Sequence, residues 1–523
     1  MPSPMDKSSR EISSRRAFLR NAALVSGAAA AAGVAPSTAA QEAAGARGRK
    51  PNILMICADQ FRADFVGANH ENPSTRTPHI DALANRGVSY RQCVTNQPLC
   101  SPSRASFTTG AYATQAGVWK LGLELDHSLP TIATELRKNG YSTNFMGKWH
   151  ISQTDLPDGS KQLGWIPPGP SRAGFDDLWE GANVLELVSH PYEGNYWDNS
   201  GANIGFKDQD RIDFIAGRAV KFIEQPHDKP WLLYVSQLEP HQQNDIDAFV
   251  PPLRYADDFS WKVYRSQLAA QQQNDLDALA HPQSPAFSDP FIPHDLRNLP
   301  GNWRSHIAGY YGCVQAIDDC VGSLTAALER SGQLDNTIVA FFSDHGCTFR
   351  TRLGEYKRSP HDSSLRVPLV IAGPGFDRSA MVDELVSLLD LAPTLLDGAG
   401  LTPPKTMCGT PLKALAADPA ARKAWDSTAY FQISQSICGR GIRTRDWCYC
   451  AFDPTVPHGN AKWSTHYQDF ALYSLSGDPA QTINLVGREE YADVADALRA
   501  ELQRRITAAG EPEAEITPIH YYA

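Results

Sequence analysis

The run Asn52-Ile53-Leu54-Met55-Ile56-Cys57 is apolar from Ile53 onward, with none of the polar alternation of a strand that has one wet face. Such a run predicts a strand buried on both faces of a parallel sheet. Similar runs lie at residues 231–235, 337–342 and 367–371, and helical patterns lie at 78–86, 131–138, 211–224 and 303–331. Strands that alternate with helices predict an α/β fold, with a large, mixed, mainly parallel sheet sandwiched by helices.

A smaller unit is predicted toward the C-terminus. The alternation of strands and helices ends near residues 411–426, where alanines and charges replace it. Short strand patterns follow at 429–433, 447–452 and 470–474, and then a helical pattern at 492–508. We therefore expect a main α/β domain at 50–415, an α+β subdomain at 426–510 and a tail at 511–523.

Residues 1–40 have the pattern of a targeting segment. The stretch Ser14-Arg15-Arg16-Ala17-Phe18-Leu19-Arg20 matches the twin-arginine signal, and a short alanine-rich run at 21–34 and small residues at 37–40 follow it. The run is too weakly apolar for a spanning helix, and no later run predicts stable membrane insertion. We expect removal of the segment near Ala40, export by the Tat translocase, and a periplasmic or secreted bacterial product.

The composition is that of a soluble globular protein without a general affinity for polyanions. The 523 residues include 42% hydrophobic and 20% charged residues, and 48 basic against 58 acidic residues give a net charge of −10. This balance argues against nucleic-acid and membrane-surface binding. An anionic substrate would have to be attracted by a local basic site.

A ten-residue stretch is duplicated. SQLEPHQQND at 236–245 recurs as SQLAAQQQND at 266–275. One extra copy is too little for a repeat fold, and a local tandem duplication in a loop is the simplest account. Only the first copy keeps a histidine, His241, so we expect the second copy to lie on the surface without a chemical role.

Polar pairs follow two of the predicted strands. Asp59 and Gln60 come after the first strand, and Asp344 and His345 come after the strand at 337–342. Because parallel strands end at one edge of a sheet, the two pairs can converge there. Their oxygens suit a hard divalent cation such as Ca²⁺ or Mg²⁺. Each pair alone is more often a turn or a helix cap.

Cys100 lies in Leu99-Cys100-Ser101-Pro102-Ser103-Arg104, with no histidine or acid beside it in sequence to activate a thiol. The segment resembles the Cys-x-Pro-x-Arg signature of the sulfatase family, in which the cysteine is oxidised to formylglycine. A buried structural cysteine before a helix is the ordinary alternative.

The resemblance to sulfatases, within the alkaline-phosphatase superfamily, extends from Pro51 to about Leu485. The segments that match in order, after Asp59 and the Cys100 motif, are GKWH at 147–150, SDHG at 343–346, RVPL at 366–369 and LYSLSGDP at 472–479. The resemblance implies an alkaline-phosphatase-like fold and a formylglycine at residue 100. It also implies a cytosolic formylglycine-generating enzyme as a partner before export.

The resemblance further implies a role for each matched residue. Asp59, Gln60, Asp344, His345 and the modified Cys100 would bind one metal ion. Sulfatases often have a second aspartate at Gln60 and an asparagine at His345, and imidazole also suits other metals, so Ca²⁺ is expected and Mg²⁺ or Mn²⁺ remain alternatives. The catalytic residues besides Cys100 would be Arg104 and Lys148 on the aldehyde hydrate, His150 as its base, and His241 and Lys357 on the sulfate.

The substrate is expected to be an organic sulfate ester, and a carbohydrate sulfate in particular. The cationic loop that contains Arg350, Arg352 and His361 surrounds Lys357 in sequence and suits a polyanionic glycan. A phosphonate monoester or phosphodiester hydrolase of the same superfamily is the alternative, since it shares the Asp-Gln and Asp-His pairs, but Lys148 and His150 argue against it. A glycan-binding protein unmodified at Cys100 is a remoter alternative.

Overall fold

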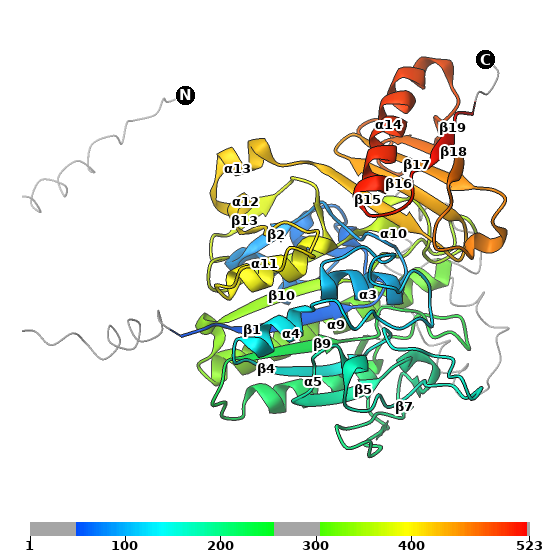
Figure 1. The fold of residues 1–523 in the computed structure, drawn as a ribbon. Coiled ribbons are helices and arrows are strands. Elements are labelled where there is room, and N and C mark those ends of the chain that lie inside the picture. The colour runs from blue at the N-terminus through cyan, green and yellow to red at the C-terminus, as the bar shows by residue number, and fades with distance from the viewer. Residues whose placement is uncertain (1–48, 256–303, 520–523) are drawn as a thin grey trace, which may run out of the picture. The chain divides into compact units, whose positions relative to one another are not determined.

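The computed structural model describes residues 49–255 and 304–519 (Figure 1). The predicted targeting segment at 1–40 and the second copy of the duplicated stretch at 266–275 lie outside the described residues. Both assignments therefore stay predictions. Within the described residues, no helix is both long enough and apolar enough to span a membrane.

An eight-stranded sheet forms the main body, in the order β13-β2-β12-β10-β1-β9-β4-β5. Five neighbouring strands are parallel: β10, β1, β9, β4 and β5. β12 is antiparallel to both β10 and β2, which makes the sheet mixed, as predicted. The strands are β1 (Asn52–Ala58), β2 (Val88–Tyr90), β4 (Ser142–Lys148), β5 (Leu178–Ala182), β9 (Trp231–Ser236), β10 (Thr337–Ser343), β12 (Leu369–Ala372) and β13 (Ala380–Val382).

Helices cover both faces of this sheet because β1 presents apolar side chains alternately to each face. Leu54 and Ile56 belong to the core with α2, α5 and α9, whereas Ile53, Met55 and Cys57 belong to the core with α3, α4 and α11. These helices are α2 (Pro78–Arg86), α3 (Cys100–Thr109), α4 (Ile132–Lys138), α5 (Arg211–Ile223), α9 (Arg304–Arg330) and α11 (Leu391–Gly398). The predicted α/β sandwich is confirmed.

The predicted strand at 367–371 is wrong as a single parallel strand. Pro368 separates β11 (Arg366–Val367) from β12, because proline has no N–H to donate to a ladder. β11 pairs instead with β3 (Cys93–Val94), which also pairs with β14 (Val386–Ser387) in a separate small sheet. β3 is the strand that precedes α3, so residues 95–99 connect this small sheet to the helix that begins at Cys100.

A five-stranded sheet with α14 (Ala492–Ala508) lies toward the C-terminus (Figure 1). Its strands are β15 (Thr428–Ile433), β16 (Cys438–Thr444), β17 (Trp447–Asp453), β18 (His466–Ser474) and β19 (Glu515–Thr517). Shorter elements are α10 (Asp362–Leu365), α12 (Lys413–Ala417), α13 (Pro419–Ala424) and a small sheet of β6 (Ser189–His190), β7 (Glu193–Gly194) and β8 (Phe206–Lys207). That the five-stranded sheet and α14 form a separate subdomain at 426–510 stays a prediction.

Residues 511–517 are not a tail, contrary to the prediction. β19 pairs in parallel with β18, and the side chain of Glu511 is buried. Glu511 accepts hydrogen bonds from Arg440 Nε at 2.7 Å, Tyr430 Oη at 3.0 Å and Thr114 Oγ1 at 3.3 Å. One carboxylate thus ties the chain end to the C-terminal sheet and to the loop after α3.

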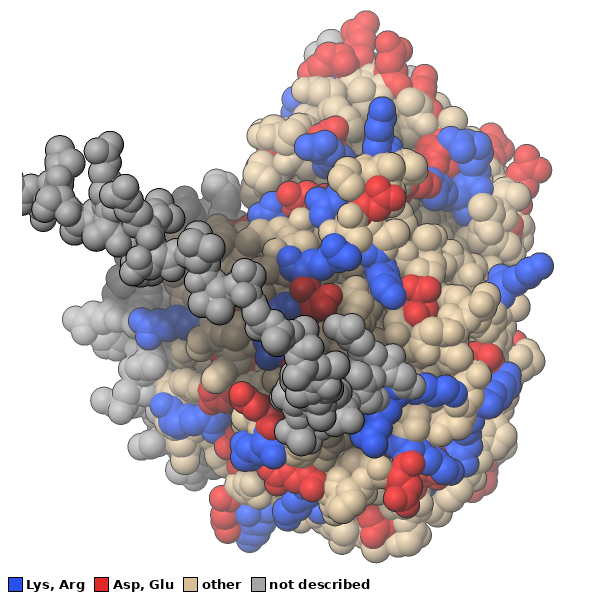
Figure 2. All heavy atoms as spheres, turned by 90° about the vertical axis from the view of Figure 1, so that its left-hand side faces the viewer, with Lys and Arg blue, Asp and Glu red and all other residues tan. Residues whose placement is uncertain are grey.

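The charged surface has no strong asymmetry on the face shown in Figure 2, where basic and acidic side chains are interspersed. Charges of both signs at short range cancel at a distance, so this face exerts little long-range attraction on a polyanion.

Replacing Glu511 by alanine should lower the free energy of unfolding by about 3–5 kcal/mol, because the buried Arg440 guanidinium would lose its counter-charge. Urea unfolding followed by circular dichroism measures this. Glu513→Ala, at an exposed position two residues away, should stay within about 0.5 kcal/mol of the parent. Equal small effects of both substitutions would show that the C-terminal segment does not contribute to stability.

Candidate active site

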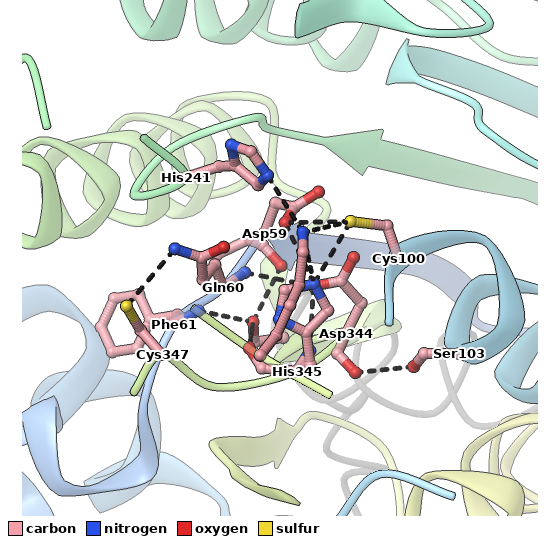
Figure 3. Close-up of polar contacts among 12 residues, drawn as sticks. Asp59, Gln60, Phe61, Cys100, Ser103, His241, Asp344, His345 and Cys347 are labelled. Atoms are coloured by element: carbon pink, nitrogen blue, oxygen red, sulfur yellow. Dashed lines mark hydrogen bonds and ion pairs between the residues drawn. The ribbon is translucent and has the colours of Figure 1, made fainter. Parts of the chain in front are cut away.

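Four potential metal ligands come together at the carboxyl ends of β1 and β10 (Figure 3). Asp59 directly follows β1 and Asp344 directly follows β10, and the last residues of the two strands pair. One ligand atom each from Asp59, Cys100, Asp344 and His345 lies within 4.8 Å of the others, and all four residues are buried. The sheet therefore brings together residues up to 286 positions apart, counting from Asp59 to His345.

Cys100 is the first residue of α3 and points into this group (Figure 3). Its Sγ lies 2.9 Å from Lys357 Nζ, 3.2 Å from His345 Nε2 and 3.7 Å from Asp59 Oδ1. Burial by itself raises the pKa of the thiol, but the charges of Lys148, Lys357 and His345 outweigh it and hold that pKa well below its ordinary value. The site thus stabilises an anionic atom at residue 100.

Arg104 joins the two aspartates. It lies one turn after Cys100 on α3, and its Nη2 and Nε donate to Asp59 Oδ2 and Asp344 Oδ2, each at 3.0 Å. Burial raises the pKa of both carboxyls. The positive charges of Lys148, His241 and Arg104 outweigh burial at Asp59 and lower its pKa below the usual value. The pKa of Asp344 stays raised, because the negative charge of Asp59 adds to the effect of burial. Asp59 is therefore the more firmly ionised of the two.

The amide of Gln60 is held in one orientation. Its Nε2 donates to Gln242 Oε1 at 2.8 Å and approaches Cys347 Sγ at 3.3 Å. Its Oε1 is buried without a hydrogen-bond partner. A buried amide oxygen with no donor needs an electropositive partner, so Gln60 completes an oxygen-rich donor set that fits a hard divalent cation.

Lys148 is the last residue of β4, and His150 lies two residues after it. Lys148 Nζ is completely buried and donates to Asp59 Oδ2 and Glu186 Oε1, both at 2.8 Å. His150 has a φ of 62°, and its interaction with Cys100 lowers the thiol pKa further. Gly147 is required before them, because a Cβ there would lie 1.9 Å from the carbonyl oxygen of Ser236 on β9.

His241 and Lys357 approach each other beside Cys100. The Nε2 of His241 lies 3.1 Å from Lys357 Nζ, and its Nδ1 lies 2.6 Å from the carbonyl oxygen of Gln242. A carbonyl accepts only, so Nδ1 carries the proton and Nε2 accepts from Lys357. The copy of the duplicated stretch that keeps a histidine thus contributes to the site, as predicted.

The three other predicted substrate-binding residues, Arg350, Arg352 and His361, contact residues outside the group around Cys100. Arg350 pairs with Asp247 at 3.3 Å, and Arg352 donates to the carbonyl oxygen of Ala480 at 2.6 Å. His361 is buried against Tyr473, and burial together with Arg352 lowers its pKa to about 3. The His361 ring is therefore uncharged at neutral pH, and its predicted contact with the substrate stays a prediction. A substrate contact at Arg350 or Arg352 stays a prediction.

Glu186 and Gln242 belong to the site but were not predicted from the sequence. Glu186 lies in a 3₁₀ turn, η4 (Leu185–Leu187), and contacts Lys148; Gln242 is the acceptor for Gln60. Neither lies in a segment with a recognisable motif. Only the position of His241 in the duplicated stretch could have directed attention to its neighbour Gln242.

Comparison with known proteins identifies the matching family. The sulfatase family model matches residues 51–401, and the model of the C-terminal region of N-sulphoglucosamine sulphohydrolase matches 354–508. An ulvan-active sulfatase of Formosa agariphila is 27% identical, with 88% of this chain and 82% of the relative covered. An N-acetylglucosamine-6-O-sulfatase of Bacteroides thetaiotaomicron is 24% identical, with 85% and 84% covered. The phosphonate monoester hydrolase of Agrobacterium radiobacter shares the fold, with a TM-score of 0.61, 23% identity and 88% and 96% covered.

The thiol of unmodified, metal-free protein should ionise below the ordinary cysteine pKa of about 8.5, since Lys148, Lys357 and His345 favour the thiolate. Thiolate absorbance near 240 nm, taken as the difference from Cys100→Ala, should therefore persist as the pH falls to neutrality. Lys357→Met should move the titration to higher pH, whereas Cys408→Ala, at an exposed cysteine, should not. A Cys100-dependent titration at or above pH 8.5 would contradict this electrostatic account.

Proposed function

This chain belongs to the sulfatase family of the alkaline-phosphatase superfamily and is a sulfuric ester hydrolase, and from this premise we propose that it desulfates a carbohydrate. The observation that carries the proposal is the cluster around Cys100. It combines potential metal ligands, a position that favours an anion, and the cations that a sulfate ester needs.

The nucleophile would come from Cys100 after its oxidation to formylglycine. The motif from Cys100 to Arg104 supports this modification, and Sγ marks where the modified side chain would stand. A formylglycine supplies an aldehyde whose hydrate has two hydroxyl groups, one to attack sulfur and one to be deprotonated later. Lys148, Lys357 and His345 all favour negative charge at this position.

A divalent cation would be held by Asp59, Gln60, Asp344 and His345 together with the modified Cys100. Ca²⁺ is proposed because three of the four unmodified side chains offer oxygen. When bound, the cation would lower the pKa of the attacking hydroxyl and offset charge on the sulfuryl oxygens. Arg104 pairs with both aspartates and would hold them in place for the cation.

The remaining groups would bind the ester and move protons. Lys357 Nζ lies between Cys100 and His241, so it can hold the sulfate where negative charge develops. His241 presents Nε2 to the same space and, once protonated, can deliver a proton to the departing alcohol oxygen. His150 also interacts with residue 100 and is the candidate base for the second hydroxyl.

A carbohydrate sulfate is the proposed substrate class. Two relatives aligned along most of this chain are named as an ulvan-active sulfatase and an N-acetylglucosamine-6-O-sulfatase. Phosphonate monoester hydrolysis is less well supported, because the likeness to that hydrolase is one of fold and the Lys148–His150 pair follows the sulfatase pattern. A purely binding role is disfavoured because potential metal ligands and Lys357 lie together at Cys100.

Maturation and export are part of the proposal. A cytosolic formylglycine-generating enzyme would convert Cys100, and the twin-arginine segment would then direct the folded enzyme through the Tat translocase to the periplasm or outside the cell. The sequence of the first 40 residues supports this route.

The mature enzyme should desulfate a sulfated oligosaccharide with a higher kcat/KM than a small aryl sulfate or a phosphonate monoester. Cys100→Ala should have no turnover but should still bind the oligosaccharide, as calorimetry can measure. Peptide mass spectrometry across residue 100 should show formylglycine in active preparations. Preference for the aryl ester would reject the carbohydrate, preference for the phosphonate would favour the other hydrolase, and full activity with an intact thiol would reject the mechanism.

Removal of the metal should abolish turnover, and Ca²⁺ should restore it. Gln242→Leu should weaken Ca²⁺ binding about 10–100-fold, because Gln60 would lose the partner that orients its amide. Calorimetric titration of chelator-treated protein measures this without reference to activity. Gln503→Leu on α14 is the matched control and should bind Ca²⁺ like the parent. Unchanged binding in Gln242→Leu would mean that the Gln60 amide needs no external orientation.

A further inference from the structure

Glu186 is a buried carboxylate that the proposed chemistry has not used. It lies in η4, just beyond the end of β5, and is 7% exposed. Oε1 accepts a hydrogen bond from Lys148 Nζ at 2.8 Å, whereas Oε2 is buried without a hydrogen-bond partner in the described structure. A buried carboxylate with an unused oxygen is costly, so its retention beside the reaction centre needs an explanation.

The first group that Glu186 orients is Lys148. An ammonium group has three N–H donors, and Lys148 gives one to Asp59 and one to Glu186. The third is left for the position of Cys100, whose thiol pKa Lys148 lowers. Without Glu186, the ammonium group could rotate toward Asp59 alone and lose this direction.

The second group is His150. Its Nδ1 lies 3.7 Å from Glu186 Oε1, and Nδ1, like Glu186 Oε2, is buried without a hydrogen-bond partner. The oxygen at 3.7 Å from Nδ1 is Oε1, which already accepts from Lys148, so the carboxylate acts on Nδ1 through its negative charge and not through a hydrogen bond. A proton on Nδ1 would be stabilised by the carboxylate, and Nε2 would then be left unprotonated for residue 100.

We infer that Glu186 is a positioning residue that holds Lys148 and selects the His150 tautomer with the proton on Nδ1. The inference deepens the proposed function and rests on it for the role of His150 as a base. A neutral imidazole can accept a proton only at the nitrogen that lacks one, so the tautomer determines whether the base faces the nucleophile. Glu186 itself touches neither the nucleophile nor the sulfate.

Glu186→Gln tests this with little change of shape. Glutamine keeps an oxygen for Lys148 but removes the negative charge that favours a proton on His150 Nδ1. Glu180→Gln is the matched control. Glu180 lies on the neighbouring strand β5, is also buried, and is paired with the cation of Arg218. Both variants are prepared as full chains, and formylglycine content is measured by mass spectrometry so that maturation is separated from catalysis.

Nitrogen-15 spectra of histidine-labelled protein measure the tautomer directly, with the His150 signals assigned by their loss in His150→Gln. In a Cys100→Ala background, where His150 has no thiol to interact with, the parent and Glu180→Gln should show His150 protonated on Nδ1, and Glu186→Gln should lose this preference. This measurement needs neither formylglycine nor turnover, so it stands even if the proposed function fails. A parent protein with His150 protonated on Nε2, or a Glu186→Gln spectrum like that of the parent, would overturn the inference.

Kinetics then measure the consequence. Glu186→Gln should lower kcat about 10–100-fold and leave KM within about twofold, while Glu186→Asp should recover part of kcat. In a double-mutant cycle with His150→Gln, the second substitution should add little to the first. Fully additive losses, or a change in KM alone, would show that Glu186 does not act through His150.

Discussion

The bridging of two buried aspartates by one guanidinium is the interaction on which the rest of the site depends. Asp59 and Asp344 directly follow two adjacent strands and are buried. Without Arg104 their two negative charges would repel each other strongly, because no water would screen them. Arg104 can reach both aspartates because α3 begins at Cys100, which places the Arg104 side chain one turn later at the sheet edge. The same helix therefore sets the position of residue 100 and the separation of the two aspartates.

Charge compensation extends this constraint over the whole cluster. Arg104, Lys148 and Lys357 contribute the permanent positive charges, and Asp59, Asp344 and Glu186 are the acids among them. Lys148 connects Asp59 to Glu186, and Lys357 connects Cys100 to His241. Buried charges of this kind are tolerated only when paired, so each side chain has little freedom to move. That rigidity is what catalysis by preorganised charge requires.

Much of this arrangement follows from the sequence because strand periodicity and short motifs are local signals. The buried run at 52–57 and the helices α2, α4, α5 and α9 were predicted close to their observed ends. β16 was not predicted because CGRGIRT has glycines and arginines where a strand pattern needs apolar residues. The buried charge of Arg440 is compensated by Glu511, which is 71 residues away in the sequence. Glu186 escaped because its meaning lies in a contact with Lys148, 38 residues away, that no local pattern encodes.

The depth of Cys100 limits when it can be altered chemically. It is 1% exposed, and the Lys357 that lies against it is 257 residues later in the chain. Under the proposed maturation, the modifying enzyme would therefore have to reach residue 100 on a nascent or incompletely folded polypeptide. Speed of synthesis and of collapse would then govern the fraction of molecules that become active. Rapid overproduction would then yield protein that is correctly folded but inactive, because Cys100 is buried before it is modified.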